Sequence, residues 1–222
     1  MKTSIVIPCY NEGERIIETL KRIKRLEFNK KIIVIDDGST DNTYFKISDN
    51  FNDIICLRHK INLGKGAALK TGCDAAILMK TDIIVLMDGD GQHLPEWIPA
   101  LINKMKAENS DIIFGVRKIG KKMPLFSFFG NKFLTSTINL LTGYYLTDSQ
   151  SGFRAFTSVA YKKIYWQSSD YFVETEIIVN AAKHSLKYSQ LEIDTIYKDN
   201  YKGTTFFDGI KIFINLIRKK IS

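Results

Sequence analysis

The residues best suited to chemistry in this chain are two aspartates that follow a short apolar stretch. Residues 83–87 read I-I-V-L-M, and residues 88–92 read D-G-D-G-Q. Two carboxylates this close repel each other unless a cation lies between them, and Mg²⁺ and Mn²⁺ prefer oxygen ligands. The pattern therefore predicts a Mg²⁺ or Mn²⁺ site formed by Asp88, Asp90 and Gln92. A polar turn without a ligand is the alternative that the local pattern leaves open.

The apolar stretch before these aspartates is typical of a strand buried on both faces, in the middle of a parallel sheet. Similar stretches recur along the first half of the chain with helical patterns between them, which indicates a Rossmann-like α/β sheet. In such sheets ligands bind beyond the carboxyl ends of the strands, which is where the acidic pair falls. The predicted strands are residues 4–7, 32–35, 54–57, 83–87 and 112–114.

Polar turns follow other predicted strands as well. Asn11 and Glu14 have the spacing of a capping box, which predicts the start of a helix. D-D-G-S-T-D at residues 36–41 places further carboxylates at the end of the second strand. N-L-G-K-G at residues 62–66 opens a predicted helix over residues 67–78. These turns are all expected at the edge of the sheet that carries the acidic pair.

Length and composition indicate one domain that does not span a membrane. The chain has 222 residues, of which 45% are hydrophobic, enough to bury a full core. Its three cysteines and three histidines are scattered, which argues against a zinc site or a disulfide framework and fits a reducing compartment. No apolar stretch reaches the ~18 residues of a spanning helix, and the first one is too short for a signal peptide. We therefore expect a cytoplasmic protein.

Two familiar nucleotide-binding patterns are missing from the sequence. Neither G-x-G-x-x-G nor G-x-x-x-x-G-K-[ST] occurs. A dinucleotide-dependent oxidoreductase and a P-loop NTPase are therefore disfavoured. Carboxylates at the ends of several strands favour a metal-assisted nucleotide site instead.

The positive charge is concentrated in two segments. The net charge is +8, from 32 basic and 24 acidic residues. Residues 117–147 contain five basic residues and no acidic one, and residues 198–222 contain six basic and two acidic residues. Both segments are also rich in large apolar residues, which favours a membrane surface over a nucleic acid as the partner. A solvated, lysine-rich face is the alternative.

Five motifs occur in one order along the chain and are recognisable together. They are I-V-I-P-C-Y-N-E at residues 5–12, D-D-G-S-T-D at 36–41, N-L-G-K-G-A-A at 62–68, D-G-D-G-Q-H at 88–93 and D-S-Q-S-G-F-R at 148–154. Together they resemble the family-two glycosyltransferases of the GT-A type, and most of all the dolichyl- or polyprenyl-phosphate sugar synthases. The resemblance covers roughly residues 3–195.

The resemblance implies a GT-A fold, with a Rossmann-like, mostly parallel central sheet flanked by helices, a C-terminal acceptor-side region and an amphipathic helix. We expect one domain over residues 1–222. Within it, residues 1–117 would form the nucleotide-sugar half, residues 118–197 the acceptor-side half and residues 198–222 a basic amphipathic tail.

The donor implied by the resemblance is a nucleotide-diphosphate sugar, either GDP-mannose or a UDP-hexose. A metal ion on the D-x-D pair would neutralise the charge that grows on the diphosphate as the glycosidic bond breaks. Tyr10 would stack on the base, and Lys65 would hold the nucleotide by its charge and by backbone N–H groups. Each position also has a purely structural reading, such as Asp37 capping a helix. The expected donor-binding residues are Pro8, Tyr10, Asn11, Glu12, Asp37, Lys65, Asp88 and Gly89.

The acceptor is expected to be a polyprenyl phosphate, with Asp90, Arg117, Asp148 and Arg154 as the catalytic residues. A lipid phosphate is already ionised, so Asp148 would orient other groups while Arg117 and Arg154 bind the phosphate. A hydroxyl acceptor would instead need Asp148 as the general base. A structural salt bridge is the alternative for the arginines. Lys122 and Lys132 are further candidate phosphate ligands.

Attachment to a membrane is expected to be peripheral, or to occur through a membrane-anchored partner subunit. Residues 123–141 contain four phenylalanines among basic residues, and residues 205–221 have apolar residues at helical spacing. Either segment could equally pack on the domain. Glu174 and Glu176, in F-V-E-T-E-I, are either acceptor contacts or exposed residues at a helix start.

Three rival functions remain from the sequence alone. The first is a family-two transferase for a glycan or other hydroxyl acceptor. The second, from another class, is a non-catalytic basic module that binds a membrane or a nucleic acid on the same fold. A nucleotidyltransferase is the third, although its usual Gly-rich, Arg-containing N-terminal loop is missing. The complete set of acidic motifs favours the enzyme, and we expect no nucleic-acid partner.

Overall fold

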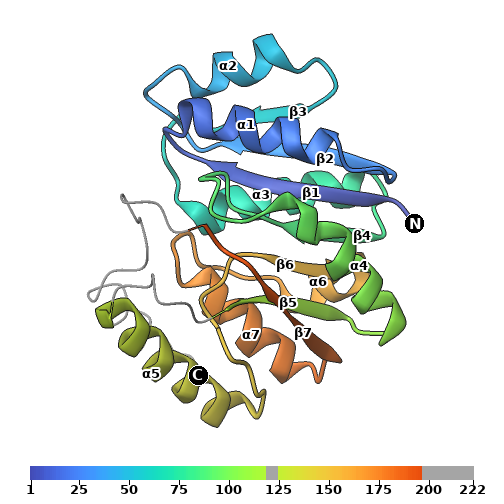
Figure 1. Cartoon of the computed structure of the whole chain (residues 1–222), viewed down its shortest axis with the longest axis vertical. Helices are drawn as coiled ribbons and strands as arrows, with labels where there is room; N and C mark the ends of the chain where they lie inside the picture. The colour runs from blue at the N-terminus through green and yellow to red at the C-terminus, as the bar shows by residue number, and fades with distance from the viewer. Residues whose placement is uncertain (119–124, 197–222) are drawn as a thin grey trace.

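The computed structural model describes residues 1–118 and 125–196, and its centre is a seven-stranded sheet (Figure 1). The strand order is β3-β2-β1-β4-β6-β5-β7. All neighbours are parallel except that β6 runs antiparallel to both β4 and β5. The strands are β1 (Thr3–Cys9), β2 (Lys30–Asp36), β3 (Ile55–Arg58), β4 (Ile83–Leu86), β5 (Ile112–Arg117), β6 (Arg154–Thr157) and β7 (Tyr188–Ile193).

The five strands predicted from apolar stretches are all present, and the sheet is mostly parallel as expected. Two strands, β6 and β7, were not predicted. β6 has only four residues and begins with the buried Arg154, and β7 alternates polar with apolar residues because it lies at the edge of the sheet. Neither has the continuous apolar stretch that marks a buried parallel strand.

Helices cover both faces of the sheet. On one face α1, α2 and α4 pack on inward residues such as Ile5, Val34 and Val85. On the other face α3, α5, α6 and α7 pack on residues such as Val6 and Ile84. Neighbouring residues of one strand thus serve opposite layers, as the pleat requires. The helices are α1 (Gly13–Lys24), α2 (Thr43–Asn50), α3 (Lys65–Leu78), α4 (Ile98–Ala107), α5 (Leu125–Thr142), α6 (Ser158–Ile164) and α7 (Val173–Lys183), with a 3₁₀ turn, η1, at Pro95–Trp97.

The start of α1 differs from the predicted capping box. The helix begins at Gly13, and Asn11 lies outside it with a positive φ of 54°. The backbone N–H groups of Glu12 and Gly13 donate to the hydroxyl of Thr43, at 3.1 and 2.8 Å. The N–H of Asn11, which the capping box would pair with Glu14, donates to the hydroxyl of Ser39 instead, so side chains from outside the helix satisfy the N–H groups at its start.

Some predicted features fall outside the described residues. These are Lys122, residues 123–124 of the phenylalanine-rich segment, and almost all of the basic tail with its apolar stripe at 205–221. Within residues 1–118 and 125–196, no helix combines the length and the apolar character needed to cross a bilayer.

Candidate functional site

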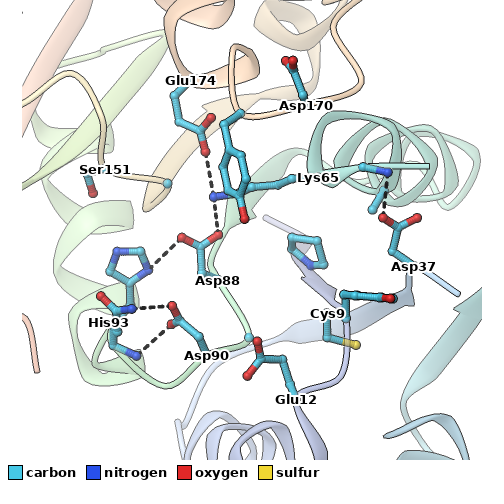
Figure 2. A pocket seen from close by; sticks show the side chains of 18 of the residues that line it. Cys9, Glu12, Asp37, Lys65, Asp88, Asp90, His93, Ser151, Asp170 and Glu174 are labelled. Carbon is cyan, nitrogen blue, oxygen red and sulfur yellow. Dashed lines mark hydrogen bonds and ion pairs between the residues drawn. The ribbon is translucent and has the colours of Figure 1, made fainter. Parts of the chain in front are cut away.

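A pocket of about 370 Å³ opens where the carboxyl ends of β1, β2 and β4 meet (Figure 2). Its opposite wall comes from the loop before β6 and from the start of α7. Parallel strands put their carboxyl ends at one edge, so motifs far apart in the sequence converge there. Ten of the predicted site residues line this pocket: Pro8, Tyr10, Glu12, Asp37, Lys65, Asp88, Gly89, Asp90, Gln92 and Arg117.

The two aspartates of the D-x-D pair have different partners. Asp90 accepts hydrogen bonds from the backbone N–H and side-chain amide of Gln92, at 2.9 and 2.7 Å. Asp88 pairs with the ammonium of Lys65 at 2.6 Å. Burial raises the pKa of Asp88, but the charge and the hydrogen bond of Lys65 outweigh it, so the pKa lies below its usual value. Both carboxylates are therefore available as anionic oxygen ligands.

This donor set fits a hard divalent cation. Asp88, Asp90 and Gln92 all line the pocket and offer two carboxylates and one amide oxygen, the ligand types that Mg²⁺ and Mn²⁺ prefer. Among the described residues, no three His, Cys, Asp or Glu side chains are close enough together to hold a metal ion by themselves. A cation bound here would therefore share the site with other oxygen ligands, such as those of a bound diphosphate.

Lys65 joins the two walls of the pocket. Its ammonium contacts Asp88 at 2.6 Å and Glu174 of α7 at 2.7 Å (Figure 2). Burial disfavours the charged ammonium, but the two carboxylates more than compensate and raise the pKa of Lys65. The ring of Tyr171 lies 5.9 Å from the ammonium. Lys65 is thus a largely enclosed, permanently charged bridge between the acidic pair and the opposite wall.

One expectation about Lys65 is wrong. We expected backbone N–H groups at the start of its helix to hold the nucleotide. Instead the N–H groups of Gly66 and Ala67 donate to the carbonyl of Ser169, at 2.7 and 3.3 Å. The N–H of Gly64 donates to Asp37. The N–H groups of residues 64, 66 and 67 are therefore taken up within the protein, while Lys65 lines the pocket.

His93 is a pocket residue that the sequence analysis did not select. It is buried and stacks on Phe153 with ring centroids 5.2 Å apart. Its Nδ1 lies 3.9 Å from Asp88 Oδ2 and has no hydrogen-bond partner among the described residues. Burial lowers the pKa of His93 below its usual value, although Asp88 and Asp90 oppose this. A neutral imidazole therefore lies beside the acidic pair.

Asp37 anchors the loop that precedes α3. Its Oδ1 receives hydrogen bonds from His59 at 2.7 Å and from the N–H of Leu63 at 3.0 Å. Its Oδ2 receives one from the N–H of Gly64 at 2.8 Å. Asp37 is buried yet lines the pocket, so one oxygen retains room for a further donor. Asp37 does not cap the next helix, α2, because the N–H groups that donate to it belong to the loop before α3.

Asn11 does not line the pocket. Its side-chain oxygen accepts from the backbone N–H of Thr40 at 2.9 Å and of Asp41 at 3.3 Å, and its own N–H donates to Ser39 at 2.9 Å. We had expected Asn11 to contact the donor. Instead, these hydrogen bonds of Asn11 hold the loop after β2 against the end of β1.

Asp148 is buried behind the pocket wall and is saturated with hydrogen bonds. It receives Nε and Nη2 of Arg117 at 2.6 and 3.0 Å, Nδ2 of Asn131 at 3.0 Å and the N–H of Gln150 at 3.0 Å. Burial raises its pKa, but the charge and hydrogen bonds of Arg117 and the bond from Asn131 outweigh burial and lower the pKa to about 2. A carboxylate this acidic and this fully bonded is a poor general base. The alternative role as a base is therefore not supported by the geometry.

Arg154 does not line the pocket either, so it is not placed to contact a phosphate there as we expected. Only 1% of the residue is exposed. Its guanidinium donates to the carbonyls of Ser151, Glu174 and Ser149, at 3.0, 2.7 and 2.9 Å. Burial lowers the pKa of Arg154 to about 10 despite nearby carboxylates. Arg154 shapes the acceptor-side wall from within, and the salt-bridge alternative is wrong as well because its partners are carbonyls.

The acceptor-side wall holds two residues that sequence reasoning undervalued. A Cβ on Gly152 would lie 2.6 Å from Asp88 Oδ2 and 2.9 Å from Lys65 Nζ, so a side chain at this position would displace the ion pair of Asp88 and Lys65. Glu174, which we left open as an exposed helix-start residue, is buried and lines the pocket. Glu176 is buried too, and its carboxylate accepts from the N–H groups of Gln167 and Ser168. Only the tertiary contact with Lys65 distinguishes the two glutamates.

Comparisons with known proteins show the family of this chain. The sequence profile of Glycosyl transferase family 2 matches residues 4–166. The UDP-N-acetylglucosamine–dolichyl-phosphate N-acetylglucosaminyltransferase of Methanococcus voltae is 35% identical over 98% of this chain and 95% of that protein. The dolichyl-phosphate beta-glucosyltransferase ALG5A of Trichomonas vaginalis is 30% identical over 86% of this chain and 64% of that protein.

A solved structure shows the same fold at lower sequence identity. Glucosyl-3-phosphoglycerate synthase from Mycobacterium tuberculosis, in complex with Mn²⁺, UDP-glucose and phosphoglyceric acid, superposes with a TM-score of 0.78. The two chains are 19% identical, and the match covers 98% of this chain and 79% of that one. Another structure of that enzyme contains Mg²⁺ and UDP. The GT-A fold that the sequence predicted is therefore confirmed.

Proposed function

The chain belongs to glycosyltransferase family 2 and is a glycosyltransferase, and we propose that it moves one hexose-type sugar from a UDP-sugar to a polyprenyl phosphate. The transfer would invert the anomeric carbon and depend on a divalent metal ion. It would take place at the cytoplasmic face of the membrane. The family and the enzyme class are shown by the comparisons, and the donor, the acceptor and the location are the proposal.

The observation that carries the choice of acceptor is the state of Asp148. A hydroxyl acceptor must lose a proton, and Asp148 was the candidate to take it. With a pKa of about 2 and donors on both oxygens, Asp148 cannot take up a proton efficiently near neutral pH. A lipid phosphate needs no base because its oxygen is already ionised. The geometry therefore favours an anionic acceptor over an alcohol.

Arg117 supports the same choice. It extends from the end of β5 into the pocket lining, and its bidentate contact with Asp148 fixes the plane of the guanidinium. An arginine fixed in this way is well suited to hold a phosphate oxygen, and Asp148 then acts by orienting Arg117. The names of the relatives from Methanococcus voltae and Trichomonas vaginalis, which both contain dolichyl-phosphate, support this acceptor class.

The choice of UDP over GDP rests on Asp37. Its Oδ1 is occupied by His59 and Leu63, whereas Oδ2 has one bond, from Gly64. One free acceptor position matches the single ring N–H of uracil, whereas guanine would present two adjacent N–H donors and need both oxygens. Tyr10, 40% exposed at the rim, could stack on the base. The UDP in the name of the Methanococcus voltae enzyme supports this choice.

A metal ion would be held by Asp88, Asp90 and Gln92, with the diphosphate completing its coordination. When bound, Mg²⁺ or Mn²⁺ neutralises the charge of the departing diphosphate, which is worth several kcal/mol. Lys65 would hold the same diphosphate from the other side through its ammonium. The Mn²⁺ and Mg²⁺ complexes of the Mycobacterium tuberculosis enzyme support a divalent ion of this kind.

Membrane attachment would be peripheral, or through a membrane-anchored partner subunit. The outer side of α5 carries the exposed residues Lys132, Phe133 and Leu140, and the described part of this helix has no acidic residue. An apolar and basic helix face of this kind suits the interface of an anionic bilayer. The division into a nucleotide-sugar half (1–117), an acceptor-side half (118–197) and a tail (198–222) remains part of the proposal.

The test is a screen of UDP- and GDP-sugars with Mn²⁺ or Mg²⁺, with and without polyprenyl phosphate. Lipid-linked sugar and free nucleoside diphosphate are both measured. We expect one UDP-sugar to yield lipid-linked sugar and UDP in equal amounts, and chelator to abolish the transfer. Turnover only with a glycan or another hydroxyl compound would replace this proposal with the hydroxyl-acceptor alternative. Membrane or nucleic-acid binding without any turnover would favour the non-catalytic module.

A further inference from the structure

Glu174 occupies a position that the binding of diphosphate and acceptor does not explain. Glu174 lies in the first turn of α7 and is 5% exposed. Its carbonyl accepts from Arg154 at 2.7 Å, and its Oε1 contacts the Lys65 ammonium at 2.7 Å. The side chain of Arg154 therefore fixes the main chain of Glu174, and the ammonium of Lys65 fixes its side chain. Such a side chain is pre-organised to present its remaining oxygen in one direction.

That remaining oxygen has no partner. Oε2 of Glu174 is buried and makes no hydrogen bond within the described part of the chain. Buried carboxylate oxygens are nearly always hydrogen-bonded, because leaving one unpaired after removal from water is costly. A simple counter-ion role with Lys65 accounts for Oε1 but not for Oε2. Because Glu174 lines the pocket, the missing donor is expected to come from a bound ligand.

The position of Glu174 identifies which part of the ligand would supply the donor. Asp88 Oδ1 and Glu174 Oε1 contact the same ammonium at 2.6 and 2.7 Å, so these oxygens are no more than about 5.3 Å apart. A diphosphate on the acidic pair therefore puts its attached sugar within reach of Glu174. Phosphate oxygens are anionic acceptors and would be repelled by Oε2, whereas sugar hydroxyl groups are donors.

We propose that Glu174 recognises the transferred sugar, with Oε2 accepting a hydrogen bond from one of its hydroxyl groups and Lys65 fixing the carboxylate through Oε1. This inference rests on the proposed UDP-sugar donor and names a specificity-determining residue for it. Gly152 makes the arrangement possible, because any side chain there would collide with Asp88 and Lys65. A sugar that lacks this hydroxyl leaves Oε2 unpaired and is selected against.

The test compares Glu174→Gln with Glu176→Gln. Both change a buried glutamate in the same turn of α7, but Glu176 caps residues 167 and 168 instead of lining the pocket. In Glu174→Gln the amide oxygen would face Lys65, so the group facing the pocket is an NH₂ that cannot accept. Dissociation constants are measured by calorimetry with Mn²⁺ for UDP, UDP-glucose, UDP-N-acetylglucosamine and the monodeoxy forms of UDP-glucose.

For Glu174→Gln we expect roughly a 10- to 100-fold loss of affinity for the UDP-sugar that the wild type prefers, the range for a hydrogen bond to a charged group. Binding of UDP should change by less than about threefold. For one monodeoxy UDP-glucose, the wild-type affinity should fall to about the affinity that Glu174→Gln has for complete UDP-glucose. Glu174→Gln itself should bind this deoxy form and complete UDP-glucose equally well. Glu176→Gln should retain the wild-type ratio of UDP-sugar to UDP affinity, whatever its melting temperature.

Three results would overturn the inference. An equal loss for UDP and UDP-sugar would mean that Glu174 acts on the diphosphate through Lys65. An unchanged UDP-sugar affinity would mean that Oε2 meets no sugar. Equal wild-type affinity for the preferred UDP-sugar and all of its monodeoxy forms would mean that no sugar hydroxyl group is recognised. All three leave the proposed acceptor untouched, because no lipid enters this assay and the acceptor is decided by the lipid-linked product.

Discussion

Replacing Asp148 with asparagine should destabilise the protein by an amount that depends on pH. The pKa of Asp148 is lowered from 3.8 to about 2, and a difference of this size corresponds to about 2 kcal/mol of folding free energy. The variant also removes the carboxylate that pairs with the largely buried guanidinium of Arg117. Removing one partner of a buried ion pair costs up to about 5 kcal/mol, so we expect a loss between about 2 and 5 kcal/mol at pH 7.

The sign of the pH dependence follows from the direction of the shift. The pKa of Asp148 in the folded state lies below that in the unfolded state, so its contribution is fully present above about pH 4 and is lost as the pH falls towards 2. The gap in unfolding free energy between wild type and Asp148→Asn should therefore be constant from pH 5 to 7. It should narrow at pH 3, where about half of the charge contribution has gone.

Urea denaturation at pH 7, 5 and 3 measures this gap. Asp194→Asn is the matched control, because Asp194 is 55% exposed in its side chain and pairs with Lys118 at 3.3 Å, and exposed pairs contribute at most about 1 kcal/mol. In activity assays, Asp148→Asn should raise KM for the lipid phosphate through Arg117. A gap of less than 1 kcal/mol at pH 7, or one that widens at pH 3, would refute the assignment of Asp148 as a permanently ionised anchor.

Three further substitutions test other parts of the site. Gly152→Ala puts a Cβ 2.6 Å from Asp88 Oδ2, so we expect the free energy of unfolding to fall by about 1–3 kcal/mol and Mn²⁺-dependent UDP binding to weaken. An unaffected variant would show that the loop before β6 can move away from Asp88 at no cost. Asp90→Ala should make UDP binding insensitive to Mn²⁺ in calorimetry, and retained stimulation would remove Asp90 from the metal site. Arg154→Lys should lower the free energy of unfolding in urea by at least about 2 kcal/mol, because an ammonium cannot reproduce the planar geometry with which the guanidinium binds three carbonyls. A variant as stable as the wild type would contradict the buried structural role of Arg154.

The central sheet could be predicted because its parallel strands are continuous apolar stretches. Residues 4–7, 32–35 and 83–87 are buried on both faces, and such stretches are recognisable without tertiary information. β6 and β7 escaped prediction for the opposite reason. A four-residue strand that starts with an arginine, and an edge strand with alternating polarity, become strands only because neighbours with free backbone groups are already in place.

The site was predicted where motifs supply both residue type and position. Asp88, Asp90 and Lys65 reached the pocket because each lies at the carboxyl end of a strand or at the start of the helix that follows one. Arg154 was misjudged, because a charged residue in a motif can face the pocket or support it from behind. Burial and hydrogen-bond partners decide between these, and neither can be read from one sequence.

Glu174 is a pocket residue that the local sequence could not identify. Nothing local separates it from Glu176, two residues away, and both lie buried in the first turn of α7. The helical turn points one carboxylate at Lys65 and the other at the backbone of residues 167 and 168. Only the packing of α7 against the start of α3 gives them different tasks.

The most direct test of the account compares two acceptors that differ only in their head group, a polyprenyl phosphate and the matching polyprenol. Both are incubated with the preferred UDP-sugar and Mn²⁺, and labelled sugar on each lipid is measured over the first turnovers. The account predicts transfer to the phosphate with an equal release of UDP, and no transfer to the alcohol, because Asp148 cannot remove the proton of a hydroxyl group. Transfer to the alcohol at a comparable rate would contradict it.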